Sequence, residues 1–191
     1  GADKMPHGTV VDPRVFVAIA ADGIVTIVAH RAEMGTGVRT SLPMIVAEEL
    51  EADWSRVRIQ QAHGDEVKYG NQDTDGSRSV RHWIQPMRHC GAAARLMLEQ
   101  AAAAQWKVPV GEVQAQLHEV VHKPSNRKLG YGQLAAAAAG LQPGDVIVQV
   151  NGKAVASAAD LKAAVSQSAD RPALLLVARR GGDVFVTLRR S

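Results

Sequence analysis

The chain has 191 residues, of which 46% are hydrophobic and 21% charged, so it can bury a core and is not a disordered tail. Its net charge of +3 comes from basic residues scattered over 140–191 rather than from a stripe, so no nucleic-acid partner is predicted. The single cysteine, Cys90, excludes an internal disulfide and a cysteine-built metal or iron–sulfur site, and no apolar run approaches the roughly 18 residues that span a bilayer.

A β-hairpin followed by a helix is predicted near the start. Two strand-like runs, 15–19 and 24–28, flank Asp22-Gly23, a tight-turn sequence. Hydrophobic residues then recur at helical spacing over 38–50. Because Pro43 fits only the first turn of a helix, we expect this helix to begin near Thr40.

A strand over 57–61, a polar loop over 62–79 and a long helix are expected next. The helix carries one hydrophobic stripe, with Pro86 near its beginning and Pro109 beyond its end. Because Cys90 lies on that stripe, we expect a buried, inert thiol. The stripe consists of Trp83, Met87, Cys90, Ala94, Met97, Ala101 and Ala104.

The histidines do not form a convincing metal site. His118 and His122 lie four apart, which would suit zinc on a helix. The weak alternation of 114–122 instead favours extended structure, where this spacing keeps the two side chains far apart. His82 and His89 lie two turns apart on the long helix. We therefore expect ordinary surface histidines and no metal site.

The remaining elements follow an alanine-rich helix over 131–139, which Gly140 should end. A strand over 145–150, a tight turn at Asn151-Gly152 and a helix over 157–166 come next. A hairpin over 173–188 closes the chain, with its turn at Gly181-Gly182.

One short motif suggests a ligand. Gly35-Thr36-Gly37 lies between a predicted strand and a predicted helix. Glycines let backbone amides approach a ligand closely, and a helix N-terminus favours negative charge, which suits an oxyanion or a metal–oxo group. The alternative is a tight strand-to-helix turn that binds nothing.

The sequence around this motif resembles the large, molybdopterin-binding subunit of the xanthine dehydrogenase family. The similarity is strongest to isoquinoline oxidoreductases and related aldehyde dehydrogenases, and it covers about residues 1–139. It is carried by residues 33–43, 46–55, 69–79 and 129–132.

The resemblance implies that Gly35-Thr36-Gly37 lies beside the molybdopterin cofactor. Thr36 stands where the family often has Gln, and its hydroxyl can also donate but reaches less far. A second cofactor-facing segment is implied at Gly76-Ser77-Arg78, for which the alternative is a solvated loop capping the long helix.

Family members also require a second large molybdenum-binding region with a catalytic glutamate, and electron-transfer partners that hold iron–sulfur clusters. Neither has a counterpart in this sequence. We therefore expect a fragment of a molybdenum hydroxylase large subunit that does not turn over substrate alone. We assign no catalytic residue and expect no bound cofactor, although the resemblance implies molybdopterin.

A second resemblance begins near residue 138 and runs to Ser191. Residues 138–147, 150–155 and 159–161 are similar to the later part of PDZ domains of HtrA-type periplasmic proteases. In a complete PDZ domain the C-terminus of a peptide adds as a strand beside a helix. Leu161 and Val165 would line half of such a groove, or alternatively belong to the core.

The sequence thus predicts an α/β or α+β protein with mixed sheets and packed helices in two subdomains, 1–139 and 140–191, joined within or just after the alanine-rich helix. Besides the fragment, two alternatives stay open: a protein-interaction module, and a recombined or engineered chimera without biological activity. Peptide C-termini or a second copy of the chain are the expected partners. Both resemblances suggest a periplasmic or cell-envelope location, although the first residues lack the features of a signal peptide.

Overall fold

The computed structural model describes residues 13–138, 146–157, 160–161, 163–164, 173–178 and 184–188. The predicted helix end at Gly140, the turn at Gly181-Gly182 and the predicted groove residue Val165 lie outside these ranges.

The first sheet has three strands in the order β1-β2-β3, preceded by the short helix α1 (Pro13–Phe16). The predicted hairpin is confirmed, because β1 (Val17–Ile19) pairs antiparallel with β2 (Val25–Ala29). The predicted strand β3 (Val57–Gln61) is also confirmed and lies parallel to β2. Two parallel neighbours need a crossover, which α2 provides.

Helix α2 spans Val38–Glu49 and so begins two residues before the predicted start. Pro43 is therefore the sixth helical residue, not one of the first turn. The earlier start is explained by the Glu33 carboxylate, which accepts hydrogen bonds from the amides of Gly37 and Arg39 and so fixes the first turn. The short elements η1 (Trp54–Arg56) and α3 (Glu66–Tyr69) follow, the latter inside the predicted polar loop.

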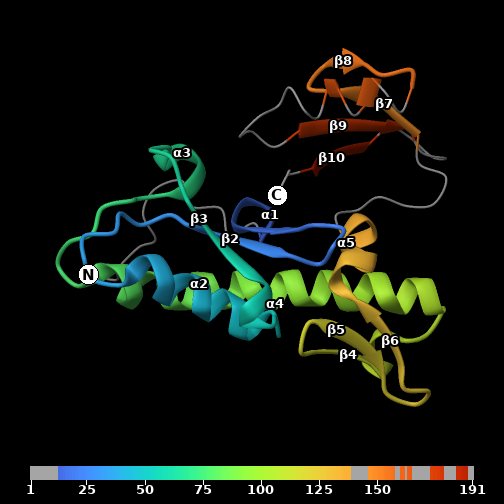
Figure 1. The fold of residues 1–191 in the computed structure, drawn as a ribbon, viewed down its shortest axis with the longest axis horizontal. Helices are drawn as coiled ribbons and strands as arrows, with labels where there is room; N and C mark the ends of the chain where they lie inside the picture. The colour runs from blue at the N-terminus through green and yellow to red at the C-terminus, as the bar shows by residue number, and fades with distance from the viewer. Residues whose placement is uncertain are drawn as a thin grey trace.

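The long helix α4 spans Arg78–Trp106 and runs beneath the first sheet (Figure 1). It begins earlier than expected, so Pro86 lies more than two turns inside it. The predicted stripe is confirmed from Trp83 to Ala94, all of whose members are buried. Farther along, the stripe member Ala101 is also buried, but Leu98 and Ala102 are the fully buried positions, because a straight helix drifts relative to a seven-residue repeat.

The segment 114–122, expected as one extended piece, is a hairpin. After the turn η2 (Val110–Glu112), β4 (Val113–Gln116) and β5 (Glu119–His122) pair antiparallel. The chain reverses at Leu117 and His118, whose φ angles of 46° and 72° are both left-handed. Strand β6 (Arg127–Gly130) completes this sheet, and helix α5 (Tyr131–Ala138) follows as predicted.

The prediction that His118 and His122 lie at the surface is wrong, since these residues are only 2% and 5% exposed. The left-handed turn folds His118 inward, where its Nε2 lies 2.6 Å from the Gly23 carbonyl oxygen and its ring stacks on Tyr131. The His122 ring lies between the side chains of Ser125 and Glu112. The His118 contact joins segments 95 positions apart, whereas the His122 contacts are local to its own hairpin.

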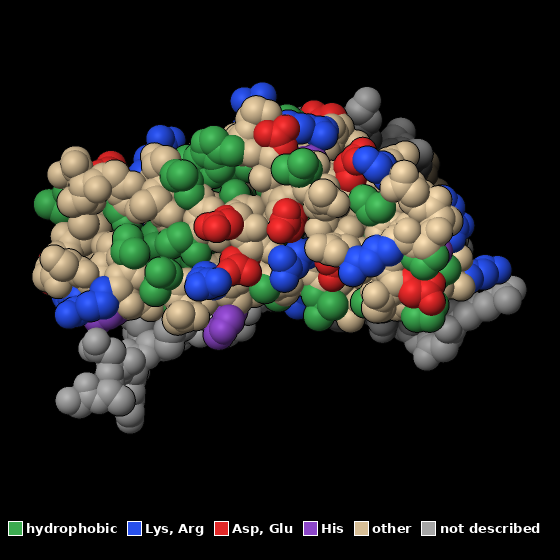
Figure 2. Space-filling view, turned by 90° about the horizontal axis from the view of Figure 1, so that it is seen from below, with side chains coloured by type: hydrophobic (Ala, Val, Ile, Leu, Met, Phe, Trp, Pro, Cys, Tyr) green, Lys and Arg blue, Asp and Glu red, His purple; other side chains and the backbone are tan. Residues whose placement is uncertain are grey.

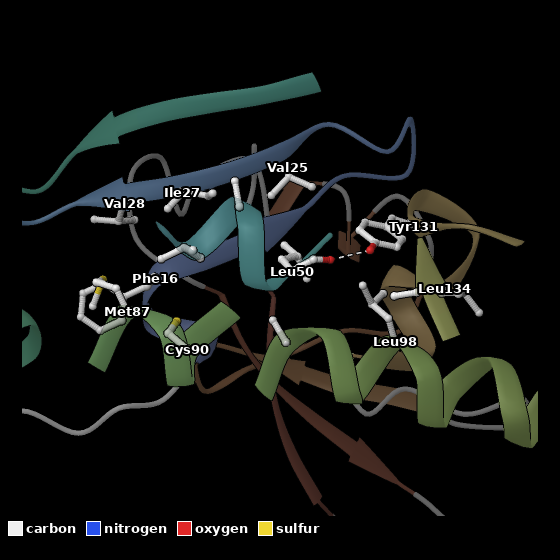
Figure 3. Packing of buried hydrophobic residues seen from close by; sticks show 14 of the residues in the cluster. Phe16, Val25, Ile27, Val28, Leu50, Met87, Cys90, Leu98, Tyr131 and Leu134 are labelled. Carbon is white, nitrogen blue, oxygen red and sulfur yellow. Dashed lines mark hydrogen bonds between the residues drawn. The ribbon is translucent and has the colours of Figure 1, made fainter. Parts of the chain in front are cut away.

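One core unites these elements (Figure 3). It lies between the first sheet and α4, and it extends to α5 through Leu134 and Tyr131. The Tyr131 hydroxyl donates to the carbonyl oxygen of Leu50 at 2.5 Å, which joins α5 to the end of α2. The Cys90 thiol is buried inside this core, as predicted.

The C-terminal strands form a separate four-stranded antiparallel sheet with the order β10-β9-β7-β8. Its buried side chains, Val150, Leu175 and Val177, make a cluster distinct from the main core. The Ser157 hydroxyl accepts from the Asp160 amide at 3.1 Å, which confirms the predicted helix start. The strands are β7 (Val146–Val150), β8 (Lys153–Ala154), β9 (Ala173–Ala178) and β10 (Val184–Leu188).

The predicted fold class is confirmed, since small mixed sheets pack with helices. Within the described ranges, none of the helices has the length and apolar character that a membrane span requires.

Candidate cofactor-facing site

Helices α2 and α4 begin at the same end of the domain (Figure 1). The residues that precede them, Gly37 and Ser77, both have left-handed φ angles, 77° and 55°, and neither helix start has a side-chain cap on that residue. The two predicted cofactor segments therefore occupy neighbouring helix starts, although they are about forty positions apart in the sequence.

The loop of Gly35, Thr36 and Gly37 presents an open face. All three residues are exposed, and a Cβ added at either glycine would meet no atom within 4 Å. Glycine is favoured at positions 35 and 37 because their φ angles are +88° and +77°, and not because neighbouring atoms leave no room for a side chain. A ligand can therefore approach this backbone from solvent.

Glu33, for which the sequence predicted no role of its own, already occupies the start of α2. Its carboxylate oxygens accept from the Gly37 amide at 3.0 Å and the Arg39 amide at 2.9 Å. The Arg39 amide, together with those of Gly37, Gly35 and Thr36, lowers the pKa of Glu33. The expected oxyanion position at this helix start is thus filled by the chain's own carboxylate.

The second segment differs in this respect. Gly76 and Ser77 have φ angles of 50° and 55°, and no side chain caps the first turn of α4 from Ser77. Arg78 is paired with the Asp75 carboxylate at the surface. The Arg78 amide donates to the Asp75 carbonyl oxygen at 3.0 Å. The segment therefore places a guanidinium beside the start of a helix, a combination that favours an anionic oxygen.

The bases of the two loops are hydrogen-bonded to each other. The Ala32 amide donates to the Gln72 carbonyl oxygen at 2.9 Å, and the Thr74 hydroxyl donates to the Ala32 carbonyl oxygen at 2.5 Å. The Gln72 side chain donates to the carbonyl oxygens of His30 and His63. This seam fixes the relative position of the two loops.

His30 lies behind the seam as a buried, neutral imidazole. It has no exposed surface, and neither ring nitrogen has a hydrogen-bond partner. Its ring packs against Trp83 and Phe16, with centroids 4.0 Å and 5.4 Å away. Burial, with the charge of Arg31 as a smaller cause, lowers the pKa of His30 to about 3.

The structure also locates the residues considered for metal, nucleic-acid and peptide binding. In the described part of the chain no three His, Cys, Asp or Glu side chains gather as metal ligands would. The face seen in Figure 2 mixes acidic and basic side chains without a continuous basic stripe. Leu161 packs against the C-terminal cluster.

The residues present suit a polyoxygenated anionic cofactor at the α4 side of this site. The donors are the Thr36 hydroxyl of the first segment and, in the second, the Arg78 guanidinium, which also contacts Asp75, beside the start of α4. The α2 amides suit it less well, because Glu33 holds them.

A family model of molybdopterin cofactor-binding domains matches residues 4–172. The chain belongs to the molybdopterin cofactor-binding domain family. This confirms the first of the two resemblances. The match also continues past residue 139, into the part for which a PDZ-like segment was predicted.

Two curated proteins are similar to this chain in sequence. The β subunit of isoquinoline 1-oxidoreductase from Brevundimonas diminuta is 42% identical over 142 residues, which cover 71% of this chain and 18% of that protein. A nicotinate dehydrogenase subunit from Pseudomonas putida is 37% identical over 99 residues, which cover 50% of this chain and 8% of that protein. The chain therefore spans less than a fifth of these relatives.

Solved structures agree on the fold. A Cu,Mo-CO dehydrogenase has a TM-score of 0.54 at 22% identity, and the match covers 63% of this chain and 15% of that chain. Quinoline 2-oxidoreductase from Pseudomonas putida 86 has a TM-score of 0.52 at 23% identity, with 67% and 17% covered. None of these relatives supports the PDZ resemblance, which stays a prediction, as does the boundary near residue 139.

Proposed function

We propose that this domain forms one wall of the molybdopterin-cofactor site of a molybdenum-dependent hydroxylase. Gly35-Thr36-Gly37 and Gly76-Ser77-Arg78 are the segments that face the cofactor. The supporting observation is the seam between Ala32 and Gln72, which places two helix starts at one end of the domain. A cell-envelope location remains part of this proposal.

In this proposal the bound cofactor supplies the redox chemistry, and the chain supplies binding and orientation. The Thr36 hydroxyl and the Arg78 guanidinium donate hydrogen bonds to cofactor oxygens. Glu33 keeps the first loop in a binding conformation by holding the amides of Gly37 and Arg39. Because the donors come from one wall, we expect weak binding by the domain alone and turnover only with the remaining regions and electron-transfer subunits.

Titration with molybdopterin cofactor released from a donor molybdoenzyme tests the proposal. We expect Arg78→Met to weaken binding roughly tenfold, because a charge-assisted hydrogen bond is lost. Arg88→Met is the matched control, since Arg88 pairs with Glu49 on the exposed side of the two helices and away from their starts. Absence of any binding by the wild-type domain, or equal losses in both variants, would contradict the proposal.

As a second candidate function, the C-terminal sheet binds an extended peptide end or a second copy of the chain. This candidate is favoured by the separate cluster under that sheet and by its two edges, β8 and β10. Exposed strand edges pair readily with another strand. If neither peptides with free hydrophobic C-termini nor the cofactor shift the melting temperature, the chimera alternative gains support.

Leu161→Ala distinguishes a core role from a groove role. Leu161 is half-buried and packs against the C-terminal cluster, so we expect the variant to lose about 2 kcal/mol of unfolding free energy. Leu174→Ala is the control, because that side chain is 43% exposed on β9. Urea unfolding measures both. Unchanged stability with a loss of peptide affinity would instead place Leu161 in a groove.

A further inference from the structure

Arg31 is a buried cation that the proposed cofactor contacts do not use. It is the second residue after the end of β2, and only 2% of its surface is exposed. Burying a guanidinium is costly unless its N–H groups are paired and its charge is compensated. A chain that keeps such a group buried needs strong local contacts around it.

Those contacts lie at the two ends of one loop. Arg31 Nη1 donates to the Asn71 backbone oxygen at 2.6 Å and to the Asn71 side-chain oxygen at 2.5 Å. Arg31 Nε donates to the Ser79 hydroxyl at 3.2 Å. Asn71 precedes Gly76 and Ser79 follows Arg78. One guanidinium thus holds both ends of the second candidate cofactor segment.

Arg31 also lies at the base of the first segment. Its neighbour Ala32 forms the seam with Gln72 and Thr74, and Gly35 lies three residues farther along. The Gln61 side chain donates to the Arg31 carbonyl oxygen at 3.1 Å. The backbone of Arg31 is therefore fixed by the end of β3 while its side chain fixes the other loop.

The surrounding charges are mainly acidic. Burial lowers the pKa of Arg31, while the carboxylates of Asp73, Asp75 and Glu66 raise it and Arg78 lowers it. Asn71 also donates to Asp73 at 3.0 Å, which extends the network around the cation. A planar guanidinium can donate in two directions at once, whereas the single ammonium of a lysine cannot reach both loop ends.

We infer that Arg31 is a positioning residue, which clamps the loop of 71–79 against the loop of 32–37 and so sets the spacing of the two cofactor-facing segments. The clamp is a property of the chain itself. Only its consequence for the cofactor rests on the proposed function.

Amide hydrogen exchange of the intact chain tests the clamp without any ligand. In Arg31→Lys and Arg31→Met we expect exchange in 32–37 and 71–79 to accelerate roughly tenfold or more, because charged hydrogen bonds are lost. Exchange in the middle of α4 and in β4–β6 should stay unchanged. Arg56→Met is the control, since Arg56 donates to the Asp22 carbonyl oxygen at 2.7 Å in another part of the domain.

Titration with released molybdopterin cofactor is the second measurement. We expect the Arg31→Lys variant to bind the cofactor at least about tenfold more weakly than the Arg56→Met variant. This difference should persist even if the two substitutions lower the melting temperature by similar amounts. If the wild-type chain does not bind the cofactor, the proposed function is wrong. The hydrogen-exchange result still decides whether Arg31 holds the two loops together. Unchanged loop exchange in both Arg31 variants, or a uniform acceleration across the domain, would overturn the inference.

Discussion

Gly91→Ala is expected to destabilise the domain by about 2–3 kcal/mol, although alanine favours helix formation by about 1 kcal/mol. A Cβ at Gly91 would lie 2.4 Å from the Val46 carbonyl oxygen and 2.8 Å from Glu49 Cβ. The first of these atoms belongs to the backbone of α2, so it cannot move aside as a flexible side chain would. The two helices must separate, and the cost of separation exceeds the gain in propensity.

Urea unfolding followed by circular dichroism measures this loss. Gly111→Ala is the matched control, because its added Cβ would meet no atom within 4 Å, and we expect its stability to stay within about 0.5 kcal/mol of wild type. A stabilised Gly91→Ala protein would mean that α2 and α4 are not in the close contact described above.

Acidification from pH 7.5 to pH 5 is expected to remove about 2 kcal/mol of stability through His30 alone. The pKa of His30 is lowered from 6.5 to about 3 in the folded protein. The unfolded chain therefore takes up a proton below pH 6.5 while the folded chain does not. The contribution of His30 to the unfolding free energy is fully present above pH 6.5. Below that pH it falls by roughly 1.4 kcal/mol per pH unit until the pH approaches 3.

His30→Leu isolates this contribution. The packing effect of the substitution is the difference in stability at pH 8, where the histidine is neutral in both states. At pH 5 we expect the unfolding free energy of the variant, relative to that of wild type, to be about 2 kcal/mol higher than the same difference at pH 8. His118, whose pKa is lowered by burial, contributes in the same direction and is unchanged in the variant. Identical pH profiles for the two proteins would contradict the buried, neutral imidazole.

The sequence was sufficient for those features that depend on local pattern. The hairpin at Asp22-Gly23, the strand over 57–61 and the stripe with Cys90 each follow from side-chain periodicity and turn chemistry. Helix boundaries were less well predicted, because the start of α2 depends on the Glu33 carboxylate and not on Pro43. The site residues at 35–37 and 76–78 came from family resemblance and stay predictions.

By itself, the sequence determined the fold class and the membership in a molybdopterin-binding family, and it suggested the two candidate segments. Only the tertiary structure decided that Arg31, His30 and His118 are buried, since each is buried through contacts with residues far away in the chain. A pattern of polar and apolar residues records which positions tend to be buried on one element. It carries no signal for a polar side chain whose burial depends on donors and acceptors from another loop.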